Sequence, residues 1–77
     1  MERAIVLFHV QSGSETHVLQ NVKKVEGVEE AHLSYGSYDI EAKLRADYMD
    51  DLKKLISNNL RKINGVRSTC SLILAKE

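Results

Sequence analysis

The chain contains one cysteine, no proline and no tryptophan among its 77 residues. The lone Cys70 excludes an internal disulfide and disfavours a structural metal site, which takes several cysteine or histidine ligands. We therefore expect no disulfide, no bound metal and no cofactor.

An excess of charge of one sign and long apolar runs are also missing. Eleven basic and eleven acidic residues give a formal net charge of zero, whereas a module that binds duplex nucleic acid carries a basic excess or patch. No apolar run approaches the ~18 residues of a membrane span, and the opening segment is too short and wrongly flanked for a signal peptide. The sequence therefore predicts a cytoplasmic protein with no direct contact to nucleic acid and no membrane association.

Recognisable catalytic motifs are absent as well. Catalysis needs a nucleophile with its base, or a matched acid and base in one pocket, and the chain has no glycine-rich phosphate loop. The candidate side chains belong to no such motif; they are His9, His17, His32, Asp39 and Cys70. The sequence thus predicts that the chain is not an enzyme.

The clearest pattern that is present lies between residues 28 and 46, which read as two strands joined by a polar turn. From Ile40 to Ala46, apolar and charged residues alternate strictly, which predicts a strand with one buried face. The turn contains Gly36, which tolerates a positive φ, and Asp39, which can bond the local backbone. We expect the five residues 35–39 to form the tip of this hairpin.

Two further strands are predicted outside the hairpin. Residues 4–10 are almost continuously apolar, which indicates a strand buried on both faces, with His9 as a hydrogen-bonded core or interface histidine. In the last strand, over residues 66–74, alternation separates Ile73 from a core-facing set in which Cys70 is a small buried residue. This core-facing set comprises Val66, Ser68, Cys70, Leu72 and Leu74.

Helices are predicted between these strands by apolar residues at helical spacing. We expect the first helix to begin with a capping box of Ser12 and Glu15 and to end at Gly27. We expect the second helix to be capped by Asp47 and to end at Gly65.

The predicted elements form two similar halves. Residues 23–28 and 61–66 share a basic-basic-apolar-polar-Gly-Val pattern with an offset of 38 residues. The resulting order, βαββαβ, predicts one α+β domain over residues 1–77 with the ferredoxin-like fold. In that fold two helices cover one face of a four-stranded antiparallel sheet, and the first and third strands are central. Apolar residues on the free face predict association with a second copy of the chain.

A family resemblance starts from the hairpin. The pattern Val28-x-x-Ala31-His32-Leu33-x-x-Gly36-x-Tyr38-Asp39, followed by an alternating strand, resembles the effector-binding domain of the Lrp/AsnC transcription regulators, also called the RAM domain. Residues 60–69, with Gly65-Val66 and Thr69, are similar to the family's helix end and the start of its last strand. Regulators of the family carry a helix-turn-helix domain before this module, so we expect a stand-alone form of it, although a piece of a longer regulator would look the same.

This resemblance implies the sensing of an amino acid or a similar small effector. Family domains dimerise through their sheets, and the dimers assemble into larger rings, often octamers, with effectors bound between dimers. The implied partners are therefore an effector, further copies of the chain and full-length Lrp/AsnC regulators, through which transcription is modulated. Carried over, the ligand-binding positions are Tyr35, Gly36, Ser37, Tyr38 and Asp39, with Thr69 and Ser71 as a second group.

Two other readings stay open at this point. The chain is alternatively a structural assembly partner that binds no small ligand, or a small dimeric ferredoxin-like enzyme. At the level of single residues, Gly36 and Asp39 have a purely structural explanation in forming the turn. Tyr38 has one as a core residue on the same face as Ile40.

Overall fold

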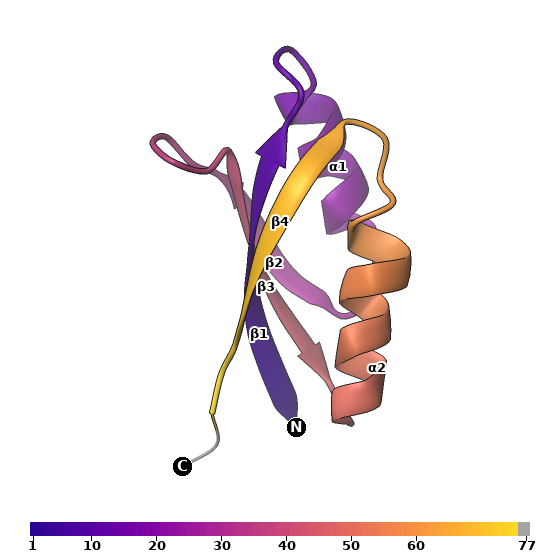
Figure 1. Cartoon of the computed structure of the whole chain (residues 1–77). Coiled ribbons are helices and arrows are strands. Elements are labelled where there is room, and N and C mark those ends of the chain that lie inside the picture. Colours follow the sequence, from indigo (N-terminus) through magenta and orange to yellow (C-terminus); the bar gives the residue numbers. More distant parts are fainter. Residues whose placement is uncertain (76–77) are drawn as a thin grey trace.

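The computed structural model describes residues 1–75 and has the predicted order of elements. A six-residue π-helical segment, η1, continues the second helix, and the two helices lie on the same face of the sheet (Figure 1). The elements are β1 (Glu2–Val10), α1 (Glu15–Lys23), β2 (Val28–Leu33), β3 (Ile40–Ala46), α2 (Met49–Lys54), η1 (Leu55–Leu60) and β4 (Val66–Ile73).

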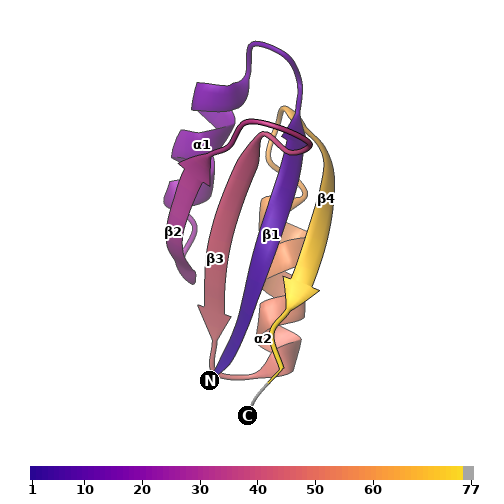
Figure 2. The same cartoon turned by 90° about the vertical axis from the view of Figure 1, so that its left-hand side faces the viewer.

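All neighbouring strands of the four-stranded sheet are antiparallel, in the order β2-β3-β1-β4 (Figure 2). The first and third strands are therefore central, as predicted, and the ferredoxin-like fold is confirmed. Alternate residues of β1 and β3 enter the core under the helices, because side chains of a strand alternate between faces. The buried apolar residues from the two central strands are Ala4, Val6, Phe8, Val10, Ile40, Ala42 and Leu44.

The helix starts differ from the predicted caps. At α1 the N-cap residue is Ser14 and makes no side-chain cap bond, so the capping box of Ser12 and Glu15 is wrong. The Glu15 carboxylate instead accepts a 3.0 Å hydrogen bond from the backbone N–H of Gly13. At α2 the N-cap residue is Tyr48 rather than Asp47.

The helix ends also differ, and the reason lies in Gly27 and Gly65. Helical structure stops at Lys23 and at Leu60, a few residues before each glycine. The glycines have φ of +98° and +102° and form the turns that lead into the next strands. A Cβ atom on Gly27 would lie 2.9 Å from the Leu55 side chain, so these positions also require glycine for packing.

The 38-residue repeat is therefore visible in three dimensions. A Cβ on Gly65 would lie 2.9 Å from Val18 of α1, just as Gly27 faces Leu55 at the start of η1. Each glycine also accepts a backbone hydrogen bond at its carbonyl, Gly27 from Arg45 at 2.8 Å and Gly65 from Gln11 at 2.7 Å. Each turn thus packs against the helix of the other half.

The strands that follow these turns carry matching irregularities. In β4, Val66 pairs with Val10 and Ser68 with His9, so Arg67 is an extra residue. In β2, Glu29 is extra in the same way, between Val28 and Glu30. An extra residue of this kind, a β-bulge, reverses the alternation of side chains that follows it.

Because of the bulge at Arg67, the side chains of β4 from Ser68 onward lie on the opposite faces of the sheet from those predicted. Cys70 pairs with Leu7 and Leu72 with Ile5, so both lie on the face of the sheet away from the helices, which we call the open face. Ile73 pairs with Ala4 and lies on the helix-covered face. The prediction that Cys70 is a buried core residue is therefore wrong, and it is half-buried.

Within one chain, β1 is buried on one face only. Its open-face residues Ile5, Leu7 and His9 are half-buried, which corrects the prediction of a strand buried on both sides. Beside them, Leu72 is 50% exposed. The open face thus presents a row of apolar side chains that residues 1–75 leave partly exposed.

Among residues 1–75, no helix has the length and apolar character needed to cross a membrane. The same part of the chain contains no group of three or more histidine, cysteine or acidic side chains placed to hold a metal ion.

Candidate functional site

The hairpin tip connects β2 to β3 and projects from the sheet on the side away from the helices (Figures 1 and 2). Gly36 has a φ of +128°, as its place in the turn predicted, and among residues 1–75 only its chain neighbours lie within 4 Å of where its Cβ would be. Tyr35 is 96% exposed. The backbone N–H of Ser34 donates to the carbonyl of Asp39 at 2.8 Å and closes the loop. The outermost part of the tip is therefore open to a ligand or a partner.

Asp39 anchors the base of the tip to the end of β1. Its backbone N–H donates to the carbonyl of Phe8 at 2.8 Å. Its carboxylate oxygen Oδ2 accepts a 2.9 Å hydrogen bond from the backbone N–H of Val10. One oxygen of this half-buried carboxylate thus has a role in the fold, which agrees with the structural explanation of Asp39.

Tyr38 lies on the open face rather than in the core with Ile40, so the interpretation of Tyr38 as a core residue is wrong. Its ring packs against the imidazole of His9, with ring centroids 4.5 Å apart and planes tilted by 33°. The neighbouring thiol of Cys70 raises the pKa of the Tyr38 hydroxyl. Tyr38 therefore reaches from the tip to side chains of both β1 and β4.

Thr69 and Ser71 of β4 lie on the other side of the sheet. They pair with Phe8 and Val6, whose side chains are buried beneath the helices. Thr69 is half-buried and Ser71 is exposed at the edge of the sheet. One chain alone therefore does not bring this second group together with the tip.

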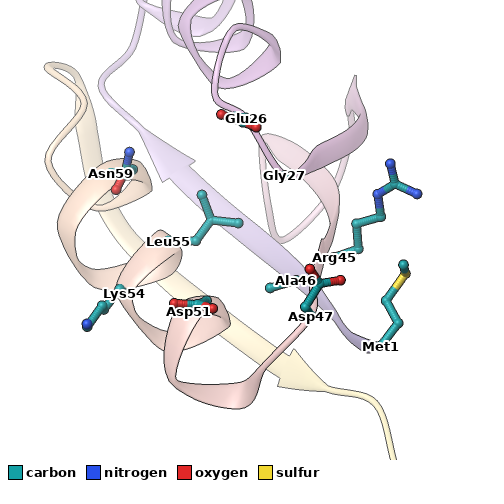
Figure 3. Close-up of a pocket in the computed structure, with 10 residues that line it drawn as sticks. All are labelled: Met1, Glu26, Gly27, Arg45, Ala46, Asp47, Asp51, Lys54, Leu55 and Asn59. Carbon is teal, nitrogen blue, oxygen red and sulfur yellow. The ribbon is translucent and has the colours of Figure 1, made fainter.

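Two cavities lie elsewhere on the described part of the chain, and neither is lined by any of the seven predicted residues. The larger, of about 630 Å³, lies where β3 leads into α2, at the opposite end of β1 from the tip (Figure 3). Its charged side chains are all exposed or half-buried, and in Figure 3 Lys54 and Arg45 extend outward from it. The lining residues are Met1, Glu26, Gly27, Arg45, Ala46, Asp47, Asp51, Lys54, Leu55 and Asn59.

The smaller cavity, of about 350 Å³, follows the edge strand β2. There the Glu30 carboxylate lies 3.1 Å from the His32 imidazole and 3.6 Å from the Lys43 ammonium. The hydrogen bond from His32 and the charge of Lys43 lower the pKa of the Glu30 carboxyl. These exposed groups form a hydrogen-bonded and charged network along β2, and charged side chains of this kind disfavour the pairing of a sheet edge with other strands.

The sequence did not indicate that His9 and Cys70 lie beside Tyr38. They are far apart in the chain, and they share a face only because of the register of β1 with β4. The apolar context of His9 was the available signal, and it indicated the core or an interface rather than a contact with Tyr38.

Comparison with known proteins gives a consistent result. Residues 3–77 match the family model of the Lrp/AsnC ligand binding domain. An uncharacterised helix-turn-helix-type transcriptional regulator of Pyrococcus furiosus is 30% identical over 70 residues, which are 90% of this chain and 47% of that protein. The chain thus spans about half the length of the curated relatives it matches.

Solved structures agree in fold. A hypothetical protein from Pyrococcus horikoshii is 30% identical, with a TM-score of 0.92 over 100% of this chain and 93% of its own. A transcriptional regulator from Neisseria meningitidis in complex with L-methionine is 17% identical, with a TM-score of 0.84 over 99% of this chain and 51% of its own. The family match over nearly the whole sequence shows that the chain belongs to the Lrp/AsnC ligand-binding domain family of transcriptional regulators.

Proposed function

We propose that the chain is a cytoplasmic regulatory module that binds an amino acid or a similar small effector at its hairpin tip and modulates transcription through partner regulators. The tip completes its ligand cleft with residues of a neighbouring copy. One observation carries the proposal: in a member of this ligand-binding family, the tip is held at its base by Asp39 and Tyr38 while Tyr35 and Gly36 face open space. The proposed role is regulatory rather than enzymatic.

The chemistry of the tip suits a free amino acid. The Oδ1 atom of Asp39 is the acceptor for an ammonium group, because Oδ2 already serves Val10. The backbone N–H groups of Gly36 and Ser37 are donors for a carboxylate, since consecutive turn amides form anion-binding concavities. In this proposal Thr69 and Ser71 contribute from β4 of a neighbouring copy, as one chain places them on the opposite face.

The open face supports assembly. We propose that two copies pack their open faces together, burying Ile5, Leu7 and Leu72, and that these dimers form a larger ring such as an octamer. Burial of apolar area favours such a contact by roughly 25 cal/mol per Å² removed from water. Gel filtration and sedimentation should show a species larger than the 8.7 kDa chain; a monomer at all concentrations would contradict this part of the proposal.

Ligand binding is tested by thermal unfolding in the presence of each common amino acid, with L-methionine first because of the Neisseria complex. A ligand at a hundred times its Kd stabilises the folded chain by about 2.7 kcal/mol, which is roughly 11–22 °C in Tm for a domain of this size. The absence of a shift with every amino acid at millimolar concentration would overturn the sensing role.

Asp39→Asn is the sharper variant for the site. Its amide oxygen still accepts from Val10 N–H, while the charge that would bind an ammonium is gone. We expect the ligand-induced shift to disappear with the fold and assembly unchanged. Asp51→Asn is the matched control, because Asp51 lines the cavity at the other end of the sheet and should leave the shift intact. A shift that survives in Asp39→Asn removes Asp39 from the site.

The second candidate is an assembly partner that forms mixed oligomers with full-length regulators and binds no small molecule. The hydrogen bond from Val10 N–H to Asp39 favours this second function, because it explains the presence of the carboxylate by the fold, without any ligand. The same screen separates the two: mixed assembly without any ligand-induced shift would favour this second function.

A further inference from the structure

Two consecutive residues attach the hairpin tip to β1 in different ways. The backbone N–H of Asp39 donates a hydrogen bond to the carbonyl of Phe8, and one oxygen of its carboxylate accepts one from the N–H of Val10. Tyr38 instead lies on the open face, with its ring against His9. Within the described part of the chain the tip has few other contacts: a Cβ on Gly36 would meet only its chain neighbours within 4 Å, and Tyr35 is almost fully exposed.

The contacts of Tyr38 lie at one end of the uncovered apolar row. His9 follows Leu7 by two residues on the same face of β1, and Cys70 pairs directly with Leu7. The row continues away from the tip through Ile5 and its partner Leu72. A partner that covers this row and extends one open-face position beyond Leu7 reaches His9, which the ring of Tyr38 contacts.

We propose that Tyr38 couples the hairpin tip to the open face, so that a second copy of the chain packed on this face holds Tyr38 against His9 and Cys70 and fixes the tip in one conformation. His9 and Cys70 are then positioning residues that act on the site through Tyr38. This inference rests on the proposed open-face dimer, and it adds to it a route by which assembly controls the ligand site.

The physical basis is the removal of water from a half-buried contact. In one chain the Tyr38 side chain is partly exposed, so the tip can detach from His9 at little cost. A partner that excludes water from the Tyr38 ring buries additional apolar surface only while the ring contacts His9, so it stabilises that conformation of the tip. Since the tip then orders before a ligand arrives, ligand affinity rises on assembly, and by reciprocity the ligand strengthens assembly by the same factor.

The test measures hydrogen exchange of the tip without any ligand, over a range of protein concentrations. The backbone N–H groups of Ser34 and Asp39 report on the tip, because both donate within its base. The N–H of Arg45, bonded to Gly27 at the other end of β3, is the internal control. We expect protection at Ser34 and Asp39 to rise as the dimer forms, beyond any change at Arg45.

Three variants test whether the protection of the tip from hydrogen exchange depends on the aromatic ring of Tyr38. Tyr38→Ala should lower tip protection in the dimer by about three- to tenfold, the range expected for one aromatic pair. Tyr38→Phe should restore most of it, because the ring contact with His9 remains. Tyr35→Ala is the matched control, since this tyrosine of the same tip is 96% exposed. The same loss in Tyr35→Ala, or full protection in Tyr38→Ala, would overturn the proposal.

The outcome is separable from that of the proposed function. If the tip gains protection on dimer formation and no amino acid binds, the coupling stands and the sensing role falls. If an amino acid binds and tip protection depends on neither protein concentration nor Tyr38, the coupling falls and the sensing role stands. His9→Ala and Cys70→Ala should then leave the Kd of that amino acid unchanged, whereas coupling requires both to weaken it.

Discussion

Between Ala4 and Phe8, β1 carries apolar side chains on both faces of the sheet, but the two faces lie in different environments. On the helix-covered face Ala4, Val6 and Phe8 are at most 1% exposed. On the open face the intervening residues Ile5 and Leu7 remain half-buried. Within one chain, only the helix-covered face of this strand has fully buried apolar side chains. The open face leaves its apolar side chains available for the second copy that we propose.

Truncation of neighbouring residues in β1 should give the largest difference between the faces. Phe8→Ala removes a fully buried ring and should cost about 3–5 kcal/mol of unfolding free energy, most of the stability of a small domain. Leu7→Ala, in the monomer, should cost about 1 kcal/mol, because the side chain is only half-buried. Urea titration at low protein concentration measures both; equal losses would mean that the open face is already covered within one chain.

Glycine substitutions extend the comparison to the turns. Gly65→Ala forces a side chain into a backbone with a φ of +102° and places its Cβ 2.9 Å from Val18 of α1. We therefore expect the free energy of unfolding to fall by roughly 2–4 kcal/mol. Gly36→Ala has the positive φ but open space, so the backbone penalty alone applies, roughly 1–2 kcal/mol. Thermal unfolding of the two variants should rank them in this order, and the reverse order would contradict the packing described at Gly65.

A lysine on either face of β4 sharpens the comparison at the level of assembly. Leu72 and Ile73 are adjacent and similarly exposed, at 50% and 43%, but they lie on opposite faces. Leu72→Lys should weaken dimer formation at least tenfold, about 1.4 kcal/mol, because it places a charge in the proposed interface. Ile73→Lys should leave association nearly unchanged. Sedimentation equilibrium decides between the faces; a larger effect in Ile73→Lys would show that the dimer does not form through the open face.

The smallest expected effect concerns pH and the network around Glu30. Because His32 and Lys43 lower the pKa of this carboxyl below its ordinary 4.5, the folded state favours the charged form. This contribution is present above the ordinary pKa and is lost as the pH falls through the lowered value. Melting curves of Glu30→Gln and the wild type should therefore converge in acid and separate slightly at neutral pH. A Glu30→Gln variant that becomes relatively less stable in acid would contradict this sign.

The sequence was sufficient for the order of elements and insufficient for their details. Strict alternation from Ile40 to Ala46 placed β3 correctly because nothing interrupts that strand. The same rule failed in β4, where the extra residue Arg67 reverses the faces, since a bulge depends on the register with β1 and leaves no local pattern. Asp47 is a better capping residue than Tyr48, yet the path of the chain out of β3 starts α2 after Tyr48.

The candidate site was predictable in part. Gly36 follows from turn chemistry, and its positive φ is observed. The placement of Tyr38 failed because parity with Ile40 assumes a regular strand, whereas the loop turns this side chain onto the open face toward His9. The ligand roles of the tip and of Thr69 and Ser71 remain predictions, because they require residues of a second copy.

The exchange of contacts between Gly27 and Gly65 has a consequence for how the chain folds. Each turn packs closely against the helical segment of the opposite half: Leu55 packs on Gly27, and Val18 packs on Gly65. Neither half can therefore complete its own turn before the other is present, which makes folding cooperative across the repeat. Cut within the hairpin tip, the chain should yield two fragments that are unstructured separately and recover the native sheet only when mixed.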